Sequence, residues 1–248
     1  MVVFVTGASS GFGYAIAKKF GTNNHKVIAL ARRKERLESL AKEIPHCIIL
    51  PCDICDKNAL KSELDSLPED FKNIDVLVNN AGLALGINPA QECDFSDWEQ
   101  MINTNIKALS HITHLLLPQM VERKSGHIIT IGSIAGRYPY PGGNVYGATK
   151  AFVRQFALGL RADLAGSNVR VSDIEPGLAE SEFSLVRFKG NSDKANALYK
   201  NSNALQPQDI AEAVYWVATL PKHININTLE MMPTSQSFSA LNVHRDSD

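Results

Sequence analysis

The stretch Val2–Gly13, with the sequence VVFVTGASSGFG, joins an apolar run directly to a glycine-rich loop. Val2–Val5 predicts a buried strand, and the apolar pattern of Tyr14–Phe20 predicts a helix that begins as the loop ends. Glycine lets the backbone approach a pyrophosphate closely, and a helix N-terminus offers free N–H groups to phosphate. This order predicts a dinucleotide site, with a turn that merely uses glycine as the alternative. The residues expected to contact the dinucleotide are Gly7, Ser9, Ser10, Gly11, Phe12 and Gly13.

The end of the next strand indicates which dinucleotide is bound. Lys26–Leu30 predicts that strand, and Arg32 and Arg33 follow it where an NAD-binding protein places a carboxylate against the ribose. Guanidinium groups pair with phosphate through two parallel hydrogen bonds. We therefore expect Arg32 and Arg33 to bind the 2′-phosphate of NADP. The alternative is that both are solvated charges at the start of a helix.

Strands and helices alternate along the rest of the chain. Apolar runs that predict further strands lie at 47–50, 74–78, 127–131, 169–174 and 229–232. This alternation predicts an α/β fold, a Rossmann-type doubly wound parallel sheet of about seven strands, as a single domain over residues 1–248. Residues 178–205 mix polar, charged and scattered apolar positions, which suits a segment that closes over a substrate.

Composition excludes several classes of partner. The 248 residues carry a net charge of −1 with both signs scattered, so we expect no nucleic-acid partner. No apolar run approaches the roughly 18 residues that would span a bilayer, and the N-terminal run is too short for a signal peptide, so we expect a cytoplasmic protein. Cys52 and Cys55 have a spacing seen in zinc and redox sites, but without a second pair or a nearby histidine we expect reduced cysteines and no metal.

A tyrosine and a lysine stand one helical turn apart in the helix expected from Asn144. These are Tyr146 and Lys150. A cation about 5 Å from a phenol, at an effective dielectric of about 20, favours the phenolate by about 3 kcal/mol, so we expect the pKa of Tyr146 to fall about two units below its ordinary value of about 10. Such a phenol can donate or accept a proton near neutral pH.

A serine distinguishes this pair from a second one. Ser133 follows the strand expected at 127–131, where its hydroxyl can hold a carbonyl oxygen beside the phenol. Tyr14 and Lys18 have the same spacing but lie just inside the glycine-rich loop. We interpret Tyr14 and Lys18 as a coincidental pair.

A long helix is expected to carry an unusual asparagine. Ser96 and Glu99 have the spacing of a capping box, so we expect this helix to begin at Ser96 and to be interrupted near Pro118. Asn105 falls inside it. Asparagine is a mediocre helix former, and hydrogen bonding to water behind the active lysine would give it a role; a solvated helix position is the alternative.

Together these features resemble the short-chain dehydrogenase/reductase family from one end of the chain to the other. The motifs that carry the resemblance are Thr6-Gly7 with Gly11 and Gly13, Asn79-Asn80-Ala81-Gly82, Asn105, Ser133, Tyr146 with Lys150, and Pro176-Gly177. By this resemblance Tyr146 is the general acid/base, Lys150 lowers its pKa and binds the nicotinamide ribose, Ser133 polarises the substrate carbonyl and Asn105 supports a proton relay. The remaining cofactor contacts that it implies are Asp53 and Ile54 at the adenine, Asn80, Ala81 and Gly82 on the ribose side, and Pro176 and Gly177 at the nicotinamide.

Within the family, the chain resembles the NADP-dependent 3-hydroxy acid dehydrogenases that also oxidise serine and allo-threonine and reduce malonic semialdehyde. The stretches that carry this likeness are 79–86, 142–154, 173–177 and 227–233. The resemblance implies a homotetramer. Two positions depart from the wider family: Ser181 is the stand-in for the threonine that usually contacts the nicotinamide amide, and Ala108 replaces a glycine that often follows the helix asparagine.

The leading hypothesis is hydride transfer between NADP(H) and the third carbon of a small 3-hydroxy acid such as L-serine, L-allo-threonine or 3-hydroxypropanoate. In the reverse direction the enzyme would reduce malonic semialdehyde. Ser133, Tyr146 and a cation for the carboxylate would bind the substrate. Arg187 is the candidate cation, with Arg137 and Lys189 as further candidates and solvated surface charge as the alternative for each. Other hypotheses are a reductase of another small carbonyl, such as a sugar or a ketoacyl thioester, and a regulatory protein that binds NADP without turnover.

Overall fold

Seven parallel strands form one sheet in the order β3-β2-β1-β4-β5-β6-β7. The computed structural model describes residues 1–200 and 202–238. The strands are β1 (Val2–Thr6), β2 (Lys26–Leu30), β3 (Cys47–Leu50), β4 (Val76–Asn79), β5 (Gly126–Ile131), β6 (Val169–Pro176) and β7 (Thr228–Met231). The predicted α/β fold with a doubly wound parallel sheet is confirmed. Residue 201, inside the segment expected to close over the substrate, and the tail from residue 239 lie outside the described residues.

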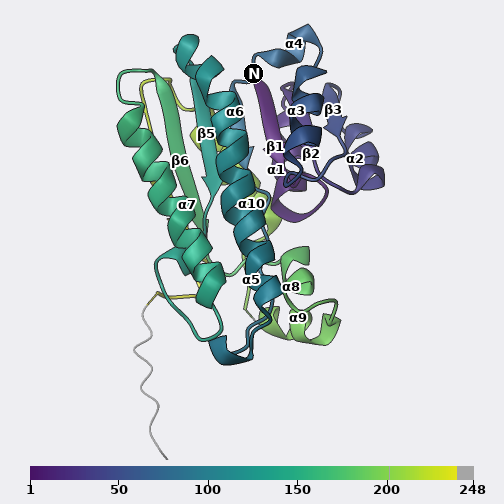
Figure 1. Cartoon of the computed structure of the whole chain (residues 1–248), viewed down its shortest axis with the longest axis vertical. Helices are drawn as coiled ribbons and strands as arrows, with labels where there is room; N and C mark the ends of the chain where they lie inside the picture. The colour runs from purple at the N-terminus through teal and green to yellow at the C-terminus, as the bar shows by residue number, and fades with distance from the viewer. Residues whose placement is uncertain (201, 239–248) are drawn as a thin grey trace, which may run out of the picture.

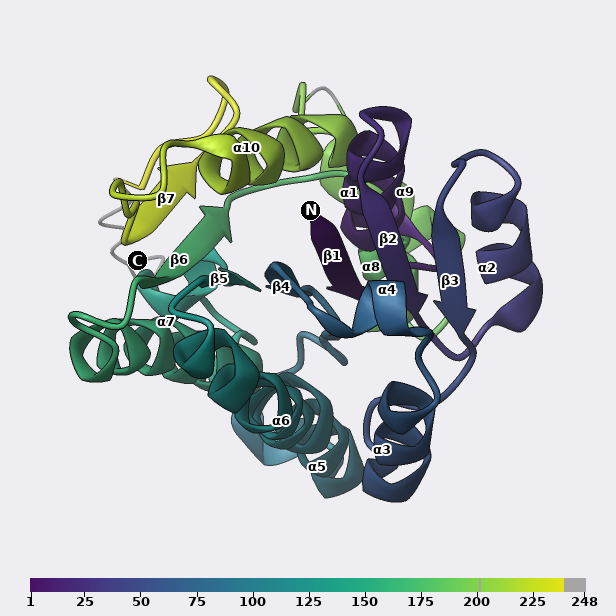
Figure 2. The ribbon, with the colours of Figure 1, turned by 90° about the horizontal axis from the view of Figure 1, so that it is seen from above.

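Helices cover both faces of this sheet (Figures 1 and 2). On one face lie α1 (Gly11–Thr22), α2 (Lys34–Ala41) and α10 (Pro207–Thr219). On the other lie α3 (Lys57–Asp65), α4 (Glu69–Lys72), α6 (Leu109–Glu122) and α7 (Asn144–Asp163). The shorter elements are α5 (Phe95–Ile102), α8 (Glu182–Arg187), α9 (Ser192–Tyr199), η1 (Ala90–Glu92), η2 (Asn103–Ala108) and η3 (Ile134–Gly136).

The apolar runs of the sequence exist because each strand is buried on both sides. Along β1, Val3 and Val5 belong to the core under α1, α2 and α10, whereas Phe4 belongs to the core under α3, α6 and α7. All three side chains are fully buried. Side chains alternate between the faces of a strand, so a strand covered on both faces needs apolar residues at successive positions.

The order of the strands sets the position of the binding crevice. The chain leaves β1 towards β2 and β3 on one side, and then returns to β4 on the other side of β1. The crevice of a doubly wound sheet lies at such a switch point, beyond the carboxyl ends of the strands. Here the loops after β1 and β4 are joined by hydrogen bonds, because the Thr6 hydroxyl oxygen accepts from the backbone N–H groups of Asn80 and Ala81 at 3.0 and 2.9 Å.

Two details of the long helix differ from the prediction. The Asp94 carboxylate accepts from the Ser96 backbone N–H at 2.9 Å, so Asp94 is the cap and α5 begins at Phe95 rather than at a capping box on Ser96. The expected interruption near Pro118 is wrong, since α6 continues to Glu122. The irregular turn lies earlier, at Asn103–Ala108, where the helix widens to π geometry. Such wide turns occur frequently at functional sites.

Residues 178–205 contain two short helices, α8 and α9. Both lie at the same end of the molecule as α5 (Figure 1). The segment starts immediately after β6, whose register with β7 runs from Asp173 to Pro176. It is therefore connected directly to the carboxyl edge of the sheet, where the crevice lies.

Candidate active site

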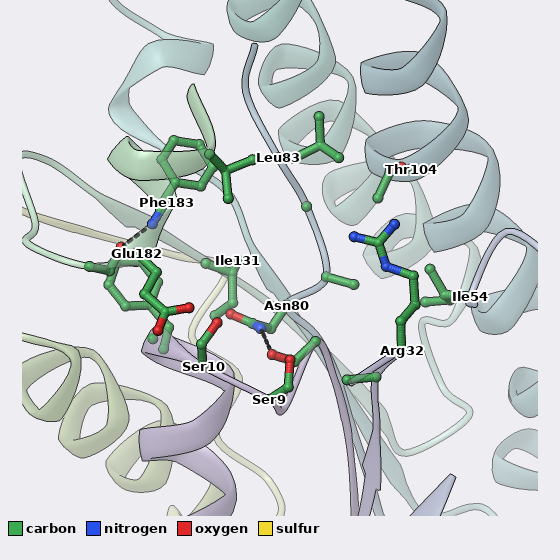
Figure 3. A pocket seen from close by; sticks show the side chains of 18 of the residues that line it. Ser9, Ser10, Arg32, Ile54, Asn80, Leu83, Thr104, Ile131, Glu182 and Phe183 are labelled. Carbon is green, nitrogen blue, oxygen red and sulfur yellow. Dashed lines mark hydrogen bonds between the residues drawn. The ribbon is translucent and has the colours of Figure 1, made fainter. Parts of the chain in front are cut away.

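A cavity of ≈ 710 Å³ lies at the carboxyl ends of the strands (Figure 3). It brings together nearly all the residues that the sequence predicted for a cofactor. The predicted residues that line it are Gly7, Ser9, Ser10, Gly11, Phe12, Arg32, Arg33, Asp53, Ile54, Asn80, Ala81, Gly82, Ser133, Tyr146, Lys150, Pro176, Gly177 and Ser181. Three others, Gly13, Asn105 and Arg187, are not among the lining residues. A single continuous cavity therefore reaches from the glycine-rich loop to the Tyr146 phenol.

The glycine-rich loop fits closely against the loop after β4. Gly7 has a φ of +69°, which L side chains rarely adopt, and a Cβ there would lie 2.9 Å from Asn80 Nδ2. A Cβ on Gly13 would overlap the carbonyl oxygen of Gly7. Side chains at these positions would collide with the loop after β4 or with the loop itself, so only glycine allows the tight turn that brings backbone N–H groups to a pyrophosphate. The loop thus fits the pyrophosphate of a dinucleotide.

The N-terminus of α1 leaves its N–H groups free of a side-chain cap. Ser10 occupies the cap position with extended backbone angles, but its hydroxyl accepts no hydrogen bond from the first turn. That hydroxyl instead accepts from Arg33 Nη2 at 2.6 Å. An uncapped helix N-terminus with its partial positive charge is a favourable place for a phosphate.

The two arginines after β2 lie at the cavity as the sequence predicted. Arg33 donates from Nε to Ser9 Oγ at 3.1 Å, so its guanidinium lies over the glycine-rich loop. Arg32 points to the other side of the cavity, next to Ile54 (Figure 3). Cations on both sides, with no carboxylate at the end of β2, suit a 2′-phosphate better than a free ribose hydroxyl.

The loop after β3 forms the far wall of the cavity. Ile54 is 7% exposed and presents an apolar surface, while the Asp53 carboxylate accepts from the backbone N–H of Cys55 at 2.9 Å. Asp53 therefore shapes its own loop. Beside β6, the Gly177 N–H donates to the Met231 carbonyl oxygen at 2.7 Å, which fixes the backbone of Pro176 and Gly177 at the opposite end of the cavity.

Tyr146, Lys150 and Ser133 meet at the end of β5. The ammonium of Lys150 donates to the Ile131 carbonyl oxygen at 2.7 Å and lies 5.9 Å from the centroid of the Tyr146 ring. Ser133 Oγ accepts from the Ala135 backbone N–H at 3.1 Å. The Ser133 hydroxyl also forms a hydrogen bond with the phenol, which acts to lower the pKa of Tyr146. Because Ser133 Oγ already accepts from a backbone N–H, its own proton is available to an oxygen atom at the phenol.

The electrostatics of the phenol differ from the prediction. Burial raises the pKa of Tyr146 above its ordinary value, and the Arg187 guanidinium and the Ser133 hydrogen bond oppose that rise only in part. Lys150 does not lower the pKa as expected. Its ammonium is directed at Ile131, and burial lowers its own pKa to about 8, against the attraction of Asp173. Burial is the largest effect on the Tyr146 hydroxyl, so the phenol holds its proton at neutral pH.

Asn105 supports the site from within the wide turn of the helix. Its Oδ1 accepts from the Leu83 N–H at 2.9 Å, and its Nδ2 donates to the Leu83 carbonyl oxygen at 2.8 Å and to Thr149 Oγ1 at 3.0 Å. A Cβ on Gly82 would lie 3.3 Å from Asn105 Oδ1 and 3.7 Å from Lys150 Nζ. The side chain of Asn105 therefore holds the loop after β4 against the lysine. Because its amide oxygen and nitrogen are both engaged in these hydrogen bonds, a proton relay through Asn105 would have to use its backbone groups.

Of the three candidate cations, only Arg187 lies at the phenol. Its guanidinium carbon is 5.0 Å from the centroid of the Tyr146 ring, and its Nη2 donates to the Tyr140 hydroxyl at 3.0 Å. Its Nε is buried and has no hydrogen-bond partner among the described residues. Arg137 is paired with the buried Glu175 carboxylate at 2.5 Å, and Lys189 is paired with Asp97 at 2.9 Å. The two further candidates are thus held elsewhere.

Some residues of the site were missed by the sequence analysis. Phe183 packs its ring 5.6 Å from that of Tyr146, and Glu182 and Leu83 line the cavity. Leu83 directly follows the Asn-Asn-Ala-Gly motif, so its position was available from the sequence. Glu182 and Phe183 had no such signal, because only the turn after β6 brings their segment back over the glycine-rich loop.

Other features of the sequence take no part in this site. Tyr14 and Lys18 both bind Glu43 on the surface of α1. The four cysteines are free thiols, and burial raises the pKa of Cys47 and of Cys52 to about 11. Within residues 1–200 and 202–238 no cluster of His, Cys, Asp and Glu side chains suited to a metal ion occurs, and no helix there has the length and apolar character needed to cross a bilayer.

Fold, cavity and residue order agree with one class of protein. The family model described as short chain dehydrogenase matches residues 1–191, and the chain belongs to the short-chain dehydrogenase/reductase family. The NADP-dependent 3-hydroxy acid dehydrogenase YdfG of Escherichia coli (strain K12) is 58% identical over 247 residues, which are 99% of this chain and 100% of that relative. The serine 3-dehydrogenase of Agrobacterium fabrum is 52% identical over 246 residues, 99% of this chain and 98% of that relative.

A solved structure described as the closed form of serine dehydrogenase complexed with NADP⁺ has the same fold. It superposes with a TM-score of 0.96 at 57% identity, and the match covers 99% of this chain and 100% of that chain. A second, of serine dehydrogenase from Escherichia coli, superposes with a TM-score of 0.84 at 52% identity and covers 96% of this chain and 100% of that chain. The chain is thus similar over its whole length to enzymes whose names specify NADP and serine.

Proposed function

We propose that this protein is an NADP-dependent oxidoreductase that transfers hydride between NADP(H) and the third carbon of small 3-hydroxy acids. L-serine, L-allo-threonine and 3-hydroxypropanoate are the proposed alcohols, and malonic semialdehyde is a proposed carbonyl substrate. The whole-chain similarity to enzymes named for 3-hydroxy acids and for serine supports this substrate class. The fit of the glycine-rich loop, Ser9, Arg32 and Arg33 to a phosphorylated dinucleotide supports NADP as the cofactor.

The observation that carries the proposal is the position of Arg187. Its guanidinium lies 5.0 Å from the Tyr146 ring, and its buried Nε has no partner in the described chain. A 3-hydroxy acid carries its carboxylate close to the hydroxyl that reacts. A cation beside the phenol, with an unsatisfied donor, suits that carboxylate, and a buried unpaired donor is costly unless a ligand completes it.

Each residue at the end of β5 has a proposed task in the proton transfer. When bound, NADP would accept the hydride in oxidation, and NADPH would donate it in reduction. Ser133 donates a hydrogen bond to the substrate oxygen and holds it beside the phenol. Tyr146 takes the hydroxyl proton during oxidation and returns it during reduction. Lys150 binds the nicotinamide ribose, and Asn105 keeps the Gly82–Leu83 backbone against Lys150.

The rates of reduction and of oxidation depend differently on the protonation state of the phenol. Its pKa is raised by burial, so at neutral pH Tyr146 carries the proton that a reduction consumes. Oxidation needs the phenolate, whose population rises with pH. We therefore propose that reduction of a semialdehyde proceeds readily at neutral pH and that oxidation of serine is faster in alkaline solution.

The test is a survey of initial rates by optical detection of NADPH. L-serine, L-allo-threonine and 3-hydroxypropanoate are compared with polyols of similar size, first with NADP and then with NAD. We expect turnover with the hydroxy acids and NADP, and much slower turnover with polyols or with NAD. Faster oxidation of polyols would contradict the substrate class and favour a reductase of sugars or of another small carbonyl. Tight NADPH binding without turnover on any alcohol would favour a regulatory protein.

We also propose a cytoplasmic homotetramer. One side of α7 packs Val153 and Ala157 into the core, while Phe152 and Phe156 stack at 5.6 Å on a side that is only half-buried. A helix with a second apolar side is suited to pack against another subunit. Light scattering after gel filtration tests the assembly, with four chains of 27.2 kDa expected and a monomer as the contradicting result. Cell fractionation tests the location.

A further inference from the structure

A carboxylate from the 178–205 segment reaches the arginines that follow β2. Arg33 uses Nε and Nη2 to contact Ser9 and Ser10, and its Nη1 donates to Glu182 Oε2 at 3.0 Å. The other oxygen of Glu182 lies 3.3 Å from Nη1 of Arg36. One carboxylate thus holds two guanidinium groups, one on each oxygen. Arg33 in turn joins the glycine-rich loop to α8.

The same short helix contacts both ends of the cavity. Glu182 is the first residue of α8 and Arg187, beside the Tyr146 ring, is its last. Just before α8, Ser181 lies against the glycine-rich loop, since a Cβ on Gly11 would be 3.4 Å from Ser181 Cβ. The position of α8 therefore sets the distance between the arginines after β2 and the cation at the phenol.

These ion pairs are too exposed to be a major source of stability. The side chains of Glu182, Arg33 and Arg36 are 39%, 45% and 56% exposed, and exposed pairs contribute little to folding. Although partial burial acts to raise the pKa of Glu182, Arg33 and Arg36 outweigh it and hold that pKa below its ordinary value. Glu182 is thus ionised at neutral pH, and its contribution lies in the orientation of the two guanidinium groups.

A phosphate bound at this place can share Arg33 with Glu182. Each terminal nitrogen of a guanidinium carries two N–H groups, so Arg33 retains unused donors beside Ser9 and Ser10. Arg32 lies across the cavity from Glu182, on the side of Ile54 (Figure 3). A phosphate between Arg32 and Arg33 would therefore be bound by guanidinium groups on both sides, and one of them would still hold α8.

We propose that Glu182 is a positioning residue that couples closure of the 178–205 segment to recognition of the 2′-phosphate of the cofactor. This inference rests on the proposed NADP-dependent function. Coupling between two sites is reciprocal, so a phosphate that favours the closed segment is itself bound more tightly when the segment is closed. A cofactor without the 2′-phosphate offers Arg33 no anion and gains nothing from Glu182. Glu182 thereby contributes to the choice of NADP over NAD although it carries a negative charge.

The first experiment compares the wild type with Glu182→Gln, which keeps the size of the side chain and removes its charge. Calorimetric titration with NADPH and with NADH measures binding without turnover. We expect NADPH to bind at least about fivefold more weakly to the variant and NADH to bind equally well, so that the preference falls by the same factor. Asp193→Asn is the matched control, because it removes an exposed carboxylate of the same segment that has no ion pair among the described residues. Glu182→Asp should retain part of the preference.

The second experiment tests the coupling by limited proteolysis within residues 178–205. Adenosine 2′,5′-bisphosphate should protect the wild-type segment more than adenosine 5′-monophosphate does, and Glu182→Gln should abolish this difference. Arg36→Gln should weaken NADPH binding in the same direction, and its effect should not add to that of Glu182→Gln. Unfolding temperatures of all variants show that they are folded.

Three outcomes would overturn the inference. Unchanged NADPH binding in Glu182→Gln would leave the carboxylate with no role in recognition, and tighter NADPH binding would mean that it competes with the phosphate. A wild type that binds NADPH no better than NADH would refute the proposed cofactor, and the inference with it. The wild-type titration therefore separates the two failures.

Discussion

The chain contains two tyrosine–lysine pairs with the same spacing and almost the same geometry, yet only one lies in an active site. Lys150 is 5.9 Å from the Tyr146 ring centroid, and Lys18 is 6.0 Å from that of Tyr14. The helix alone accounts for this likeness, because residues one turn apart are neighbours on its surface. What differs is everything around the two pairs.

The surroundings give the two phenols different chemistry. The Tyr14 hydroxyl donates to Glu43, and this hydrogen bond is the main reason that its pKa is raised. Within the part of the chain that the structure describes, Tyr146 has no carboxylate partner; burial raises its pKa, while Arg187 and Ser133 favour the phenolate. A phenol bound to a carboxylate keeps its proton, whereas a phenol facing a hydroxyl and a guanidinium can exchange it with a substrate. The spacing of a motif therefore determines distances, and the neighbours determine reactivity.

The largest expected difference between the two pairs is the effect on kcat of removing each phenol hydroxyl. Tyr146→Phe is expected to reduce kcat by about 10²-fold to 10⁴-fold or more, since the proton donor and acceptor is lost. NADPH binding should be preserved, which calorimetry can check. Tyr14→Phe, the matched control, should retain wild-type rates. Substantial turnover by Tyr146→Phe would refute the assignment of Tyr146.

The pH dependence of the rate should follow the Tyr146 phenol. Its raised pKa means that the phenolate, which oxidation needs, forms only in alkaline solution. The kcat for serine oxidation should thus rise between about pH 7 and about pH 10, whereas reduction of malonic semialdehyde should not rise in that range. Steady-state rates in buffers of constant ionic strength measure both profiles. Tyr14→Phe should leave the profiles unchanged, and a flat oxidation profile would contradict the proposed base.

The carboxylate site should respond to Arg187 more than to its neighbour Lys189. Arg187→Ala is expected to raise the KM for serine by about tenfold or more, because a charge-assisted hydrogen bond of about 1.5–3 kcal/mol is lost. Lys189→Ala removes a nearby cation that is paired with Asp97, and it should change this KM little. An unchanged KM for serine in Arg187→Ala would remove Arg187 from the site.

The two lysines should contribute to stability with opposite dependence on pH. Burial lowers the pKa of Lys150 from 10.5 to about 8, so between these values the unfolded chain binds more protons than the folded one. Folding stability due to Lys150 therefore rises with pH across that window, by about 3 kcal/mol in total. The pKa of Lys18 is raised by its hydrogen bond to Glu43, so its small contribution changes in the other direction.

Urea unfolding at about pH 7 and about pH 10 measures this difference between the lysines. The stability of the wild type relative to Lys150→Met should increase with pH, because the cost of the buried charge disappears only in the wild type. The stability of the wild type relative to Lys18→Met should not increase. An equal response of the two variants to pH would contradict the burial of the Lys150 charge.

The smallest effect is expected from release of the surface pair. Glu43→Gln removes the carboxylate that holds both Tyr14 and Lys18. Activity should not change, and the unfolding temperature should change little, because exposed ion pairs contribute little to stability. If Glu43→Gln restored reductase activity to Tyr146→Phe, the conclusion that only the Tyr146–Lys150 pair is catalytic would be wrong.

Local patterns were sufficient for much of this molecule. The strands lie close to where apolar runs predicted them, because each strand is buried on both faces. Nearly all the residues predicted for the cofactor line one cavity, since motifs that follow parallel strands lie at one edge of the sheet.

Contacts between distant segments could not be read in this way. The bond from Lys150 to the Ile131 carbonyl oxygen changes the expected electrostatics of the phenol. The pairing of Arg33 with Glu182 joins residues far apart in the chain. Neither contact leaves a periodic signal in the sequence, because both depend on how loops and helices are oriented once the sheet has formed.

By itself, the sequence determined the alternation of strands and helices, the glycine-rich loop and the distance between each tyrosine and its lysine. These are local properties of backbone geometry and apolar spacing, which act over a few residues. Only the tertiary structure decided which phenol faces a serine, which arginine remains available to a carboxylate and which acid reaches the arginines after β2. Those choices depend on burial and on charges brought together from distant parts of the chain, and the free energy of a charge depends on its whole surroundings.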